Sequence, residues 1–105
     1  EFSRTPLFNP TGGRDHHFTN SSLLIGAGIQ PGRVIGRSTE VGMSPVTFDF
    51  ANQSTLGDDD RGSGPDQRHI TPADIGATLL ASADLRYGEY RDGHPLWEAL
   101  QTTPY

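Results

Sequence analysis

Glycine and proline interrupt this chain so often that long regular elements are excluded. Thirteen glycines and eight prolines are spread over 105 residues, and both residue types favour turns over the interiors of helices and strands. Leucine, isoleucine, valine and phenylalanine make up only about a fifth of the chain, near the limit below which sequences bury too little apolar surface to fold. We therefore expect short elements, many turns and a small core.

The negative charge and the absence of lysine and cysteine argue against several classes of function. The chain has 13 acidic and 8 basic side chains, a formal net charge of −5, no lysine and no cysteine. A disulfide scaffold and a thiolate metal site both need cysteine. An acidic, lysine-free chain is a poor partner for nucleic acid or for an anionic membrane surface. No apolar run approaches the ~20 residues that span a bilayer, so we expect neither a nucleic-acid partner nor a membrane span.

Three short apolar runs predict strands in the first half of the chain. Residues 22–26 form a continuous apolar run of the kind found in buried strands. Residues 33–36 form a second candidate after a Pro-Gly turn. Residues 46–50 alternate apolar with polar side chains, which predicts a strand exposed on one face. Residues 51–68, rich in aspartate and glycine, are expected to form a loop.

The clearest element is a helix that begins after Thr71. Thr71 suits the N-cap, Pro72 the first helical position, and Asp74 the third position, where its charge meets the positive end of the helix. Apolar side chains then recur at every fourth residue and predict a buried face that runs to about residue 85. That face consists of Ile75, Leu79 and Ala83, with Gly76 and Leu80 alongside. A second, short helix is expected at residues 95–100.

Residues 13–17, Gly-Arg-Asp-His-His, bring together several side chains that can bind a metal ion or an anion. Histidine is a common metal ligand, and a neighbouring carboxylate can orient its ring or join the ligand set. Arg14 suits the bidentate binding of a phosphate or sulfate, and Glu1 and Arg4 can converge on the same place. On residue chemistry alone, a surface feature and a ligand pair both remain open. The acidic triplet 58–60 departs from a calcium-loop pattern and is interpreted as a solvated loop.

Several of these segments together resemble a known family. The resemblance covers nearly the whole chain, most weakly at 46–68 and 88–105. It rests on residues 1–6 (Glu-Phe-Ser-Arg-Thr-Pro), 13–16 (Gly-Arg-Asp-His), 23–29 (Leu-Leu-Ile-Gly-Ala-Gly-Ile), 32–36 (Gly-Arg-Val-Ile-Gly), 38–42 (Ser-Thr-Glu-Val-Gly) and the helix from Thr71. These segments resemble the uncharacterised, sulfatase-like family of exported bacterial proteins within the alkaline phosphatase superfamily.

The resemblance implies a fold and a domain organisation. The chain would be α/β, the C-terminal part of an alkaline-phosphatase-like three-layer αβα sandwich with two or three short strands and one main helix. Residues 1–105 would form a single partial domain of a larger one, and the remainder of the parent chain would be its partner. The resemblance also implies export to the periplasm or cell envelope.

The resemblance further implies roles for individual residues. His16 stands where the superfamily places a late metal-ligating histidine, Glu1 replaces the aspartate of an Asp-His ligand pair, and Phe2 replaces the histidine of that pair. Asp15 would be a ligand or would support one, and Arg4 and Arg14 would hold an anionic substrate. The cofactor would be a divalent ion such as zinc or calcium.

Two functions follow as expectations, and a third possibility is a free-standing small binding module. The first is a segment of a metallohydrolase that acts on small phosphate or sulfate esters, inactive as an isolated chain because a two-metal site needs ligands from several strand ends. The alternative is a non-catalytic envelope or interaction protein that keeps the fold without the chemistry, which the loss of a ligand at Phe2 favours.

Overall fold

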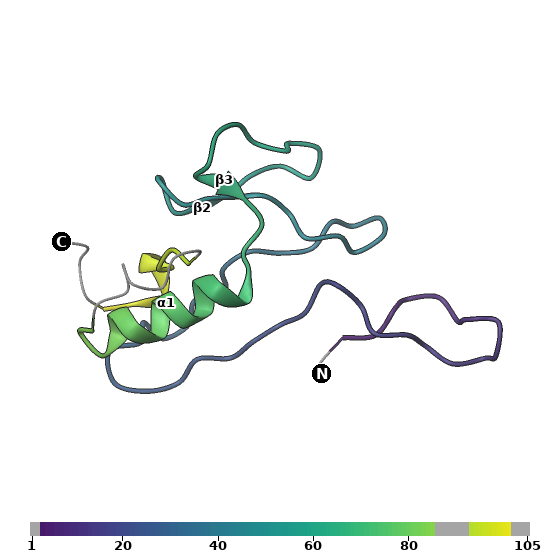
Figure 1. The fold of residues 1–105 in the computed structure, drawn as a ribbon, viewed down its shortest axis with the longest axis horizontal. Coiled ribbons are helices and arrows are strands. Elements are labelled where there is room, and N and C mark those ends of the chain that lie inside the picture. The colour runs from purple at the N-terminus through teal and green to yellow at the C-terminus, as the bar shows by residue number, and fades with distance from the viewer. Residues whose placement is uncertain (1–2, 86–92, 102–105) are drawn as a thin grey trace.

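The computed structural model describes residues 3–85 and 93–101, which form a mixed α/β fold with one helix and one small sheet among them. The sheet contains β1 (Phe48–Asp49), β2 (Ser54–Thr55) and β3 (Gln67–Arg68), in the antiparallel order β2-β1-β3. Phe48 is opposite Thr55 on one side and Arg68 on the other. The helix α1 spans Pro72–Ser82, and a 3-10 turn, η2, spans Trp97–Ala99 (Figure 1). The three-layer sandwich is not shown by these elements.

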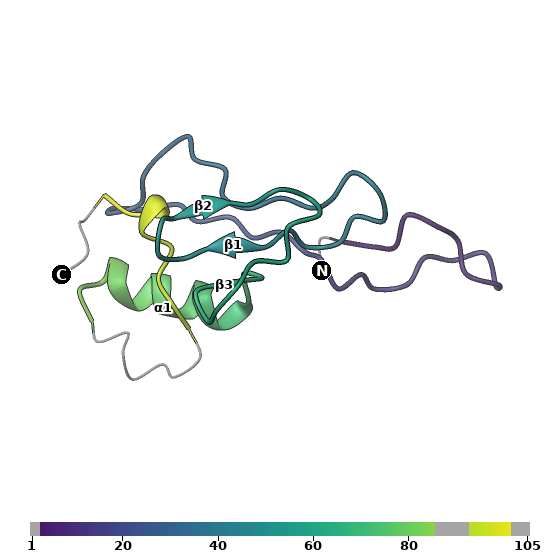
Figure 2. The same cartoon turned by 90° about the horizontal axis from the view of Figure 1, so that it is seen from above.

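The core is small and lies between the sheet, α1 and the 93–101 segment. Phe48, Phe50, Leu96 and Ala99 are buried together, and Leu24, Ile35, Ile70 and Ile75 pack against them. The Phe48 and Phe50 rings meet edge to face with 5.0 Å between centroids, a favoured aromatic arrangement. Figure 2 shows the strands beside α1. The small core agrees with the low content of large apolar residues.

The prediction of a strand at 46–50 was correct in place and wrong in exposure. Only Phe48–Asp49 pair as a strand, and every residue from 46 to 50 is buried. Asp49 tolerates burial because its carboxylate accepts hydrogen bonds from the Asn52 N–H (3.0 Å), Asn52 Nδ2 (2.9 Å) and Gln67 Nε2 (3.1 Å). These bonds, led by that of the Asn52 side chain, lower the pKa of Asp49. Residues 51–68, expected to be a loop, contain β2 and β3.

The strands predicted at 22–26 and 33–36 are absent. Neither segment pairs with another strand within the described residues, and the one backbone–backbone hydrogen bond described for them is the 3.3 Å turn bond from the Ile29 N–H to the Gly26 carbonyl. Gly36 has a φ of +74°, in the left-handed region that ends a strand. Leu24 and Ile35 still pack against the core, so each segment contributes apolar contact without joining the sheet.

The helix predicted after Thr71 is confirmed, but its buried face is different. Asp74, Ala77, Thr78 and Ala81 are the buried positions, whereas Leu79 and Ala83 of the predicted face are exposed. Small side chains face inward because the 93–101 segment approaches α1 closely. Thr78 Oγ1, for example, accepts a 2.9 Å hydrogen bond from the Leu96 N–H. The helix expected at 95–100 is reduced to the single turn η2.

One buried carboxylate joins three parts of the fold. Asp74 is fully buried and accepts two 2.8 Å bonds from the Arg68 guanidinium, a 2.7 Å bond from the Thr71 N–H and a 2.8 Å bond from the His94 N–H. Arg68 also lies over the Phe50 ring at 4.4 Å. Burial alone raises the pKa of the Asp74 carboxyl, but the bonds from Arg68, Thr71 and His94 outweigh it, so the pKa lies below its ordinary value.

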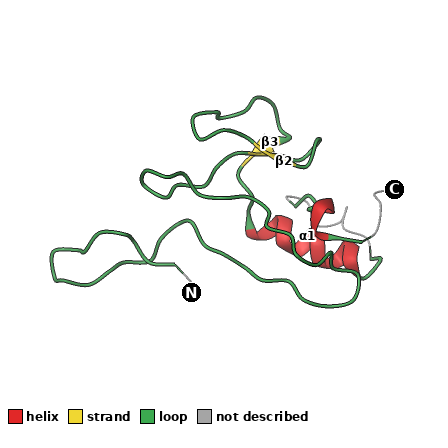
Figure 3. Ribbon diagram, turned by 180° about the vertical axis from the view of Figure 1, so that it is seen from behind, coloured by secondary structure: helices red, strands yellow, loops and turns green. Residues whose placement is uncertain are grey.

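Residues 3–27 form an arm that extends away from the other described residues, 28–85 and 93–101, which we call the body. Its inner end is held where Ile29 pairs with Leu100, with hydrogen bonds from Gln30 N to Ala99 O and from Gln101 N to Gly28 O, both 2.8 Å. The arm then runs past α1 and projects beyond the body (Figures 1 and 3). The radius of gyration is 15.1 Å, above the roughly 13 Å of a compact domain of this length. Within the described ranges, no helix is both long and apolar enough to cross a membrane.

Candidate functional site

The outer part of the arm is a hairpin that collects most of the predicted site residues. Arg4 pairs with His16 in an antiparallel bridge, and the Thr5 N–H donates a 2.9 Å hydrogen bond to the Asp15 carbonyl. A 3.4 Å bond from His17 N to Ser3 O closes the base of the hairpin. The backbone therefore brings Arg4 beside the Arg14–His16 segment, although about ten residues separate them in sequence.

Asn9 holds the turn of this hairpin. Its side-chain oxygen accepts hydrogen bonds from the Thr11 N–H (3.1 Å), the Thr11 hydroxyl (2.8 Å) and the Gly13 N–H (2.9 Å). Asparagine stabilises turns in this way because its short side chain substitutes for a backbone carbonyl. The turn composition of residues 9–13 is therefore explained by a specific set of bonds, and Arg14 follows directly from it.

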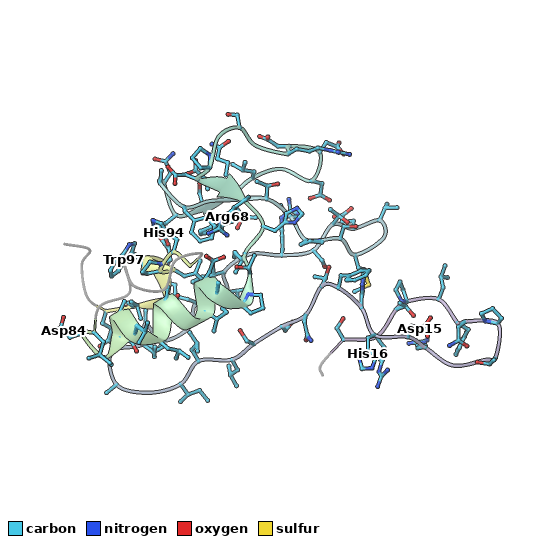
Figure 4. All side chains as sticks on the ribbon, viewed as in Figure 1. Asp15, His16, Arg68, Asp84, His94 and Trp97 are labelled. Carbon is cyan, nitrogen blue, oxygen red and sulfur yellow. The ribbon has the colours of Figure 1, made fainter. Side chains whose placement is uncertain are left out.

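The charged side chains of the hairpin are exposed and mutually arranged. Asp15 accepts a 3.0 Å hydrogen bond from Asn9 Nδ2. The Arg14 guanidinium lies over the Phe8 ring, 4.8 Å from its centroid, and Arg4 Nη1 donates a 3.5 Å bond to the Arg14 carbonyl. Figure 4 shows Asp15 and His16 near the narrow part of the hairpin, far from the labelled residues of the body. The hairpin therefore carries, next to its turn, the Arg14 cation stacked on the aromatic ring of Phe8.

The described residues do not complete a metal centre. Asp15 and His16 offer an oxygen and a nitrogen donor of the kinds that zinc accepts, yet no group of three or more histidine, cysteine, aspartate or glutamate side chains in residues 3–85 and 93–101 is placed to hold an ion. Glu1, the other predicted ligand, lies outside the described residues. Of the donor side chains in the hairpin, Asp15, His16 and His17, no three are placed together to hold an ion in the part of the chain that the structure describes.

The arm also carries large apolar side chains that are mostly exposed in the described structure. Their exposed fractions range from 68% to 102%. They are Leu7, Phe8, Phe18, Leu23 and Ile25. Isolated exposed apolar residues are ordinary on protein surfaces, but their concentration in one projecting segment is typical of an interaction site.

The sequence contained a signal for this exposed row. In an extended chain, successive side chains point to opposite faces, and residues 23–25 are apolar at all three positions, the pattern of a strand covered on both sides. The body covers one side, because Leu24 packs against the core. Leu23 and Ile25 remain exposed. The prediction of a buried strand here is therefore wrong, since one side of this run is exposed within the described residues.

An acidic cleft lies on the body, between the loops 39–44 and 58–59. Its volume is about 440 Å³, and it is lined by Thr39, Glu40, Val41, Ser44, Asp58 and Asp59. Asp58 forms an ion pair with Arg37 and accepts a 3.2 Å bond from the Glu40 N–H; the hydrogen bond from Arg37, followed by that from Glu40, lowers the pKa of Asp58. Val41 on its wall is 89% exposed. The sequence indicated the acidic loop but not the apolar wall beside it.

Comparison with known proteins identifies one family. A protein-family model described as a protein of unknown function (DUF1501) matches residues 1–84. No curated protein and no solved structure matches the chain. The family expected from the sequence resemblance, the sulfatase-like proteins of the alkaline phosphatase superfamily, is therefore wrong: the match is to a different family, and none of the comparisons names a sulfatase. The motifs that suggested it, at residues 1–6 and 13–16, lie within the matched range.

Proposed function

This chain belongs to the DUF1501 family, and we propose that it acts through its arm, which docks on a polypeptide surface. The observation that carries this proposal is the row of five exposed apolar side chains on the arm. Burial of one such side chain contributes about 1.5–3 kcal/mol, so the row offers up to roughly 8–15 kcal/mol. Association costs on the order of 4–15 kcal/mol, so burial of these side chains is of the size needed to offset that cost.

Charge defines the surface that the arm would select. The arm carries two arginines, Arg4 and Arg14, against one aspartate, Asp15, and Arg14 is held over Phe8 at the tip. Complementary charge steers association and suppresses wrong partners. The expected surface is therefore apolar in its centre and acidic at the place that receives the hairpin.

A photoreactive side chain tests docking by the arm. Phe18 is replaced by benzoylphenylalanine in one protein, and Leu79, half exposed on α1, is replaced in a control. We expect irradiation in the producing cells to give a discrete polypeptide adduct from position 18 and none from position 79, because only the arm lies against a partner. The adducts are measured by electrophoresis and mass spectrometry. Equal adduct patterns from the two positions, or none from position 18, contradict the proposal.

A second candidate function is favoured by the composition of the hairpin. We propose it as the alternative: the chain is a segment of an exported, metal-dependent hydrolase of phosphate or sulfate esters. Arg4 and Arg14 would bind the ester anion through their guanidinium groups. Asp15 and His16 would supply two metal ligands, and the remainder of the parent chain would supply the others, as part of a larger sandwich domain. The observation in its favour is that one hairpin gathers all four side chains.

Metal content separates the two candidates. The complete gene product is purified without chelator as the parent sequence, as His16→Ala and as His69→Ala, an exposed histidine of the body that serves as the control. The hydrolase candidate predicts that the parent protein is purified with bound metal and that His16→Ala lowers the affinity for this metal at least roughly tenfold, so that less of it is retained. Even residues that only support metal ligands have effects of this size. Elemental analysis measures it. Equal metal content in all three proteins contradicts it, as does ester turnover by the 105-residue chain alone that His16→Ala abolishes.

A further inference from the structure

The body of this chain itself presents the kind of surface that the arm needs. The described residues outside the arm carry nine carboxylates and four arginines, whereas the arm carries two arginines and one carboxylate. The acidic cleft concentrates part of this charge. Asp58 is already paired with Arg37, but Glu40 and Asp59 form no ion pair within the part of the chain that the structure describes. A cation that enters the cleft therefore meets the carboxylates of Glu40 and Asp59, which no arginine of the described residues neutralises.

The hairpin tip matches this cleft in chemistry as well as in charge. Arg14 and Phe8 form a unit in which a guanidinium covers an aromatic ring. The cleft offers the apolar Val41 beside Glu40 and Asp59. The cleft is open to solvent and has a volume of about 440 Å³, which is room for one aromatic side chain. The ring would then lie against Val41 while Arg14 reaches the carboxylates.

From this complementarity we propose that the arm of one copy docks on the body of a second copy, with its tip in the acidic cleft. The inference rests on the proposed function and names the partner. The hairpin 3–17 and the loop 39–44 project from the same side of the body (Figure 1), so two copies can face each other and exchange arms. Such an exchange is reciprocal and closes as a two-fold dimer, in which the exposed arm residues of each chain are covered by the other chain.

Reversal of one charge on each side of the contact tests the inference. Sedimentation measures the dimer dissociation constant of the chain, of Arg14→Glu and of Asp59→Arg. We expect the unsubstituted chain to dimerise as its concentration rises and each single variant to dimerise roughly tenfold less tightly or worse, because like charges then meet at both contacts. An equimolar mixture of the two variants is expected to regain the dimer. In the mixed dimer, one contact is native and the other has both charges reversed, so both contacts are matched.

The controls make each outcome decisive. Asp66→Arg makes the same charge change at an exposed position outside the cleft and is expected to leave dimerisation unchanged. Glu40→Arg replaces Asp59→Arg if circular dichroism shows the latter unfolded. A chain that stays monomeric, a mixture that fails to regain the dimer, or an equal loss in Asp66→Arg overturns the inference. A discrete adduct from position 18 that lacks a second copy of the chain also overturns it, yet leaves docking by the arm intact.

Discussion

Asp74→Ala is expected to lower the free energy of unfolding by about 3–5 kcal/mol, a large part of the roughly 5–15 kcal/mol that stabilises a typical domain. The fully buried carboxylate satisfies the Arg68 guanidinium and the N–H groups of Thr71 and His94. Alanine leaves all three donors without this acceptor and disconnects β3 and the 93–101 segment from the start of α1. Urea unfolding followed by circular dichroism measures the loss, and a change below about 1 kcal/mol contradicts the role assigned to this residue.

The same carboxylate gives stability a predicted pH dependence. Its pKa is lowered in the folded chain from an ordinary value of 3.8, so its stabilisation is present above about pH 4 and is lost as the pH falls through the folded pKa. The isosteric Asp74→Asn variant is the matched control, because it keeps the shape and removes the titration. Its unfolding free energy should fall less steeply below about pH 4 than that of the unsubstituted chain. Identical acid profiles would show that Asp74 is not the titrating group.

Phe48→Ala is expected to destabilise the chain by about 3–5 kcal/mol. Phe48 is 1% exposed and packs with Phe50, Leu96 and Ala99, so truncation leaves a cavity at the centre of a small core. The matched control is Phe18→Ala, where the ring is 102% exposed; in dilute solution it should change stability by less than about 0.5 kcal/mol. Urea unfolding of the two variants measures both values. Similar losses from both would mean that the arm is packed against its own body.

Local signals predicted the parts of this fold that local interactions determine. The start of α1 follows from Thr71, Pro72 and Asp74 within four residues, and all three lie where the sequence placed them. The turn at residues 9–13 likewise depends on the side chain of Asn9 acting within its own segment. Such features need no knowledge of distant contacts, because a cap or a turn is stabilised by its immediate neighbours.

Contacts between distant segments determined the rest. The inward face of α1 was predicted from large apolar residues, but the approach of Leu96 to Thr78 selects small side chains there. The burial of Asp49 depends on Gln67, 18 residues away, and that of Asp74 depends on His94, 20 residues away. No periodicity in the sequence encodes these partners. The strand at 22–26 failed for a related reason, since an extended apolar run forms a strand only where another strand pairs with it.

The candidate site was predicted in part. Sequence reasoning singled out Arg4, Arg14, Asp15 and His16, and the hairpin brings these residues together. Their assignment to a metal and an ester stays a prediction. Sequence reasoning missed the exposed row on the arm and the acidic cleft, because exposure and concavity depend on the folded body. The apolar run that contains Leu23 and the acidic triplet that contains Asp59 are visible in the sequence. Which of their side chains stay exposed is decided only by the folded chain.

The mass of the irradiated adduct at position 18 tests the central claim most directly. Purified chain that carries benzoylphenylalanine there is irradiated over a range of protein concentrations and analysed by mass spectrometry. We expect an adduct with twice the mass of a single chain, more abundant at higher concentration, in which the photoreactive group is joined to the body of the other copy. A product that keeps the mass of a single chain at every concentration would contradict it.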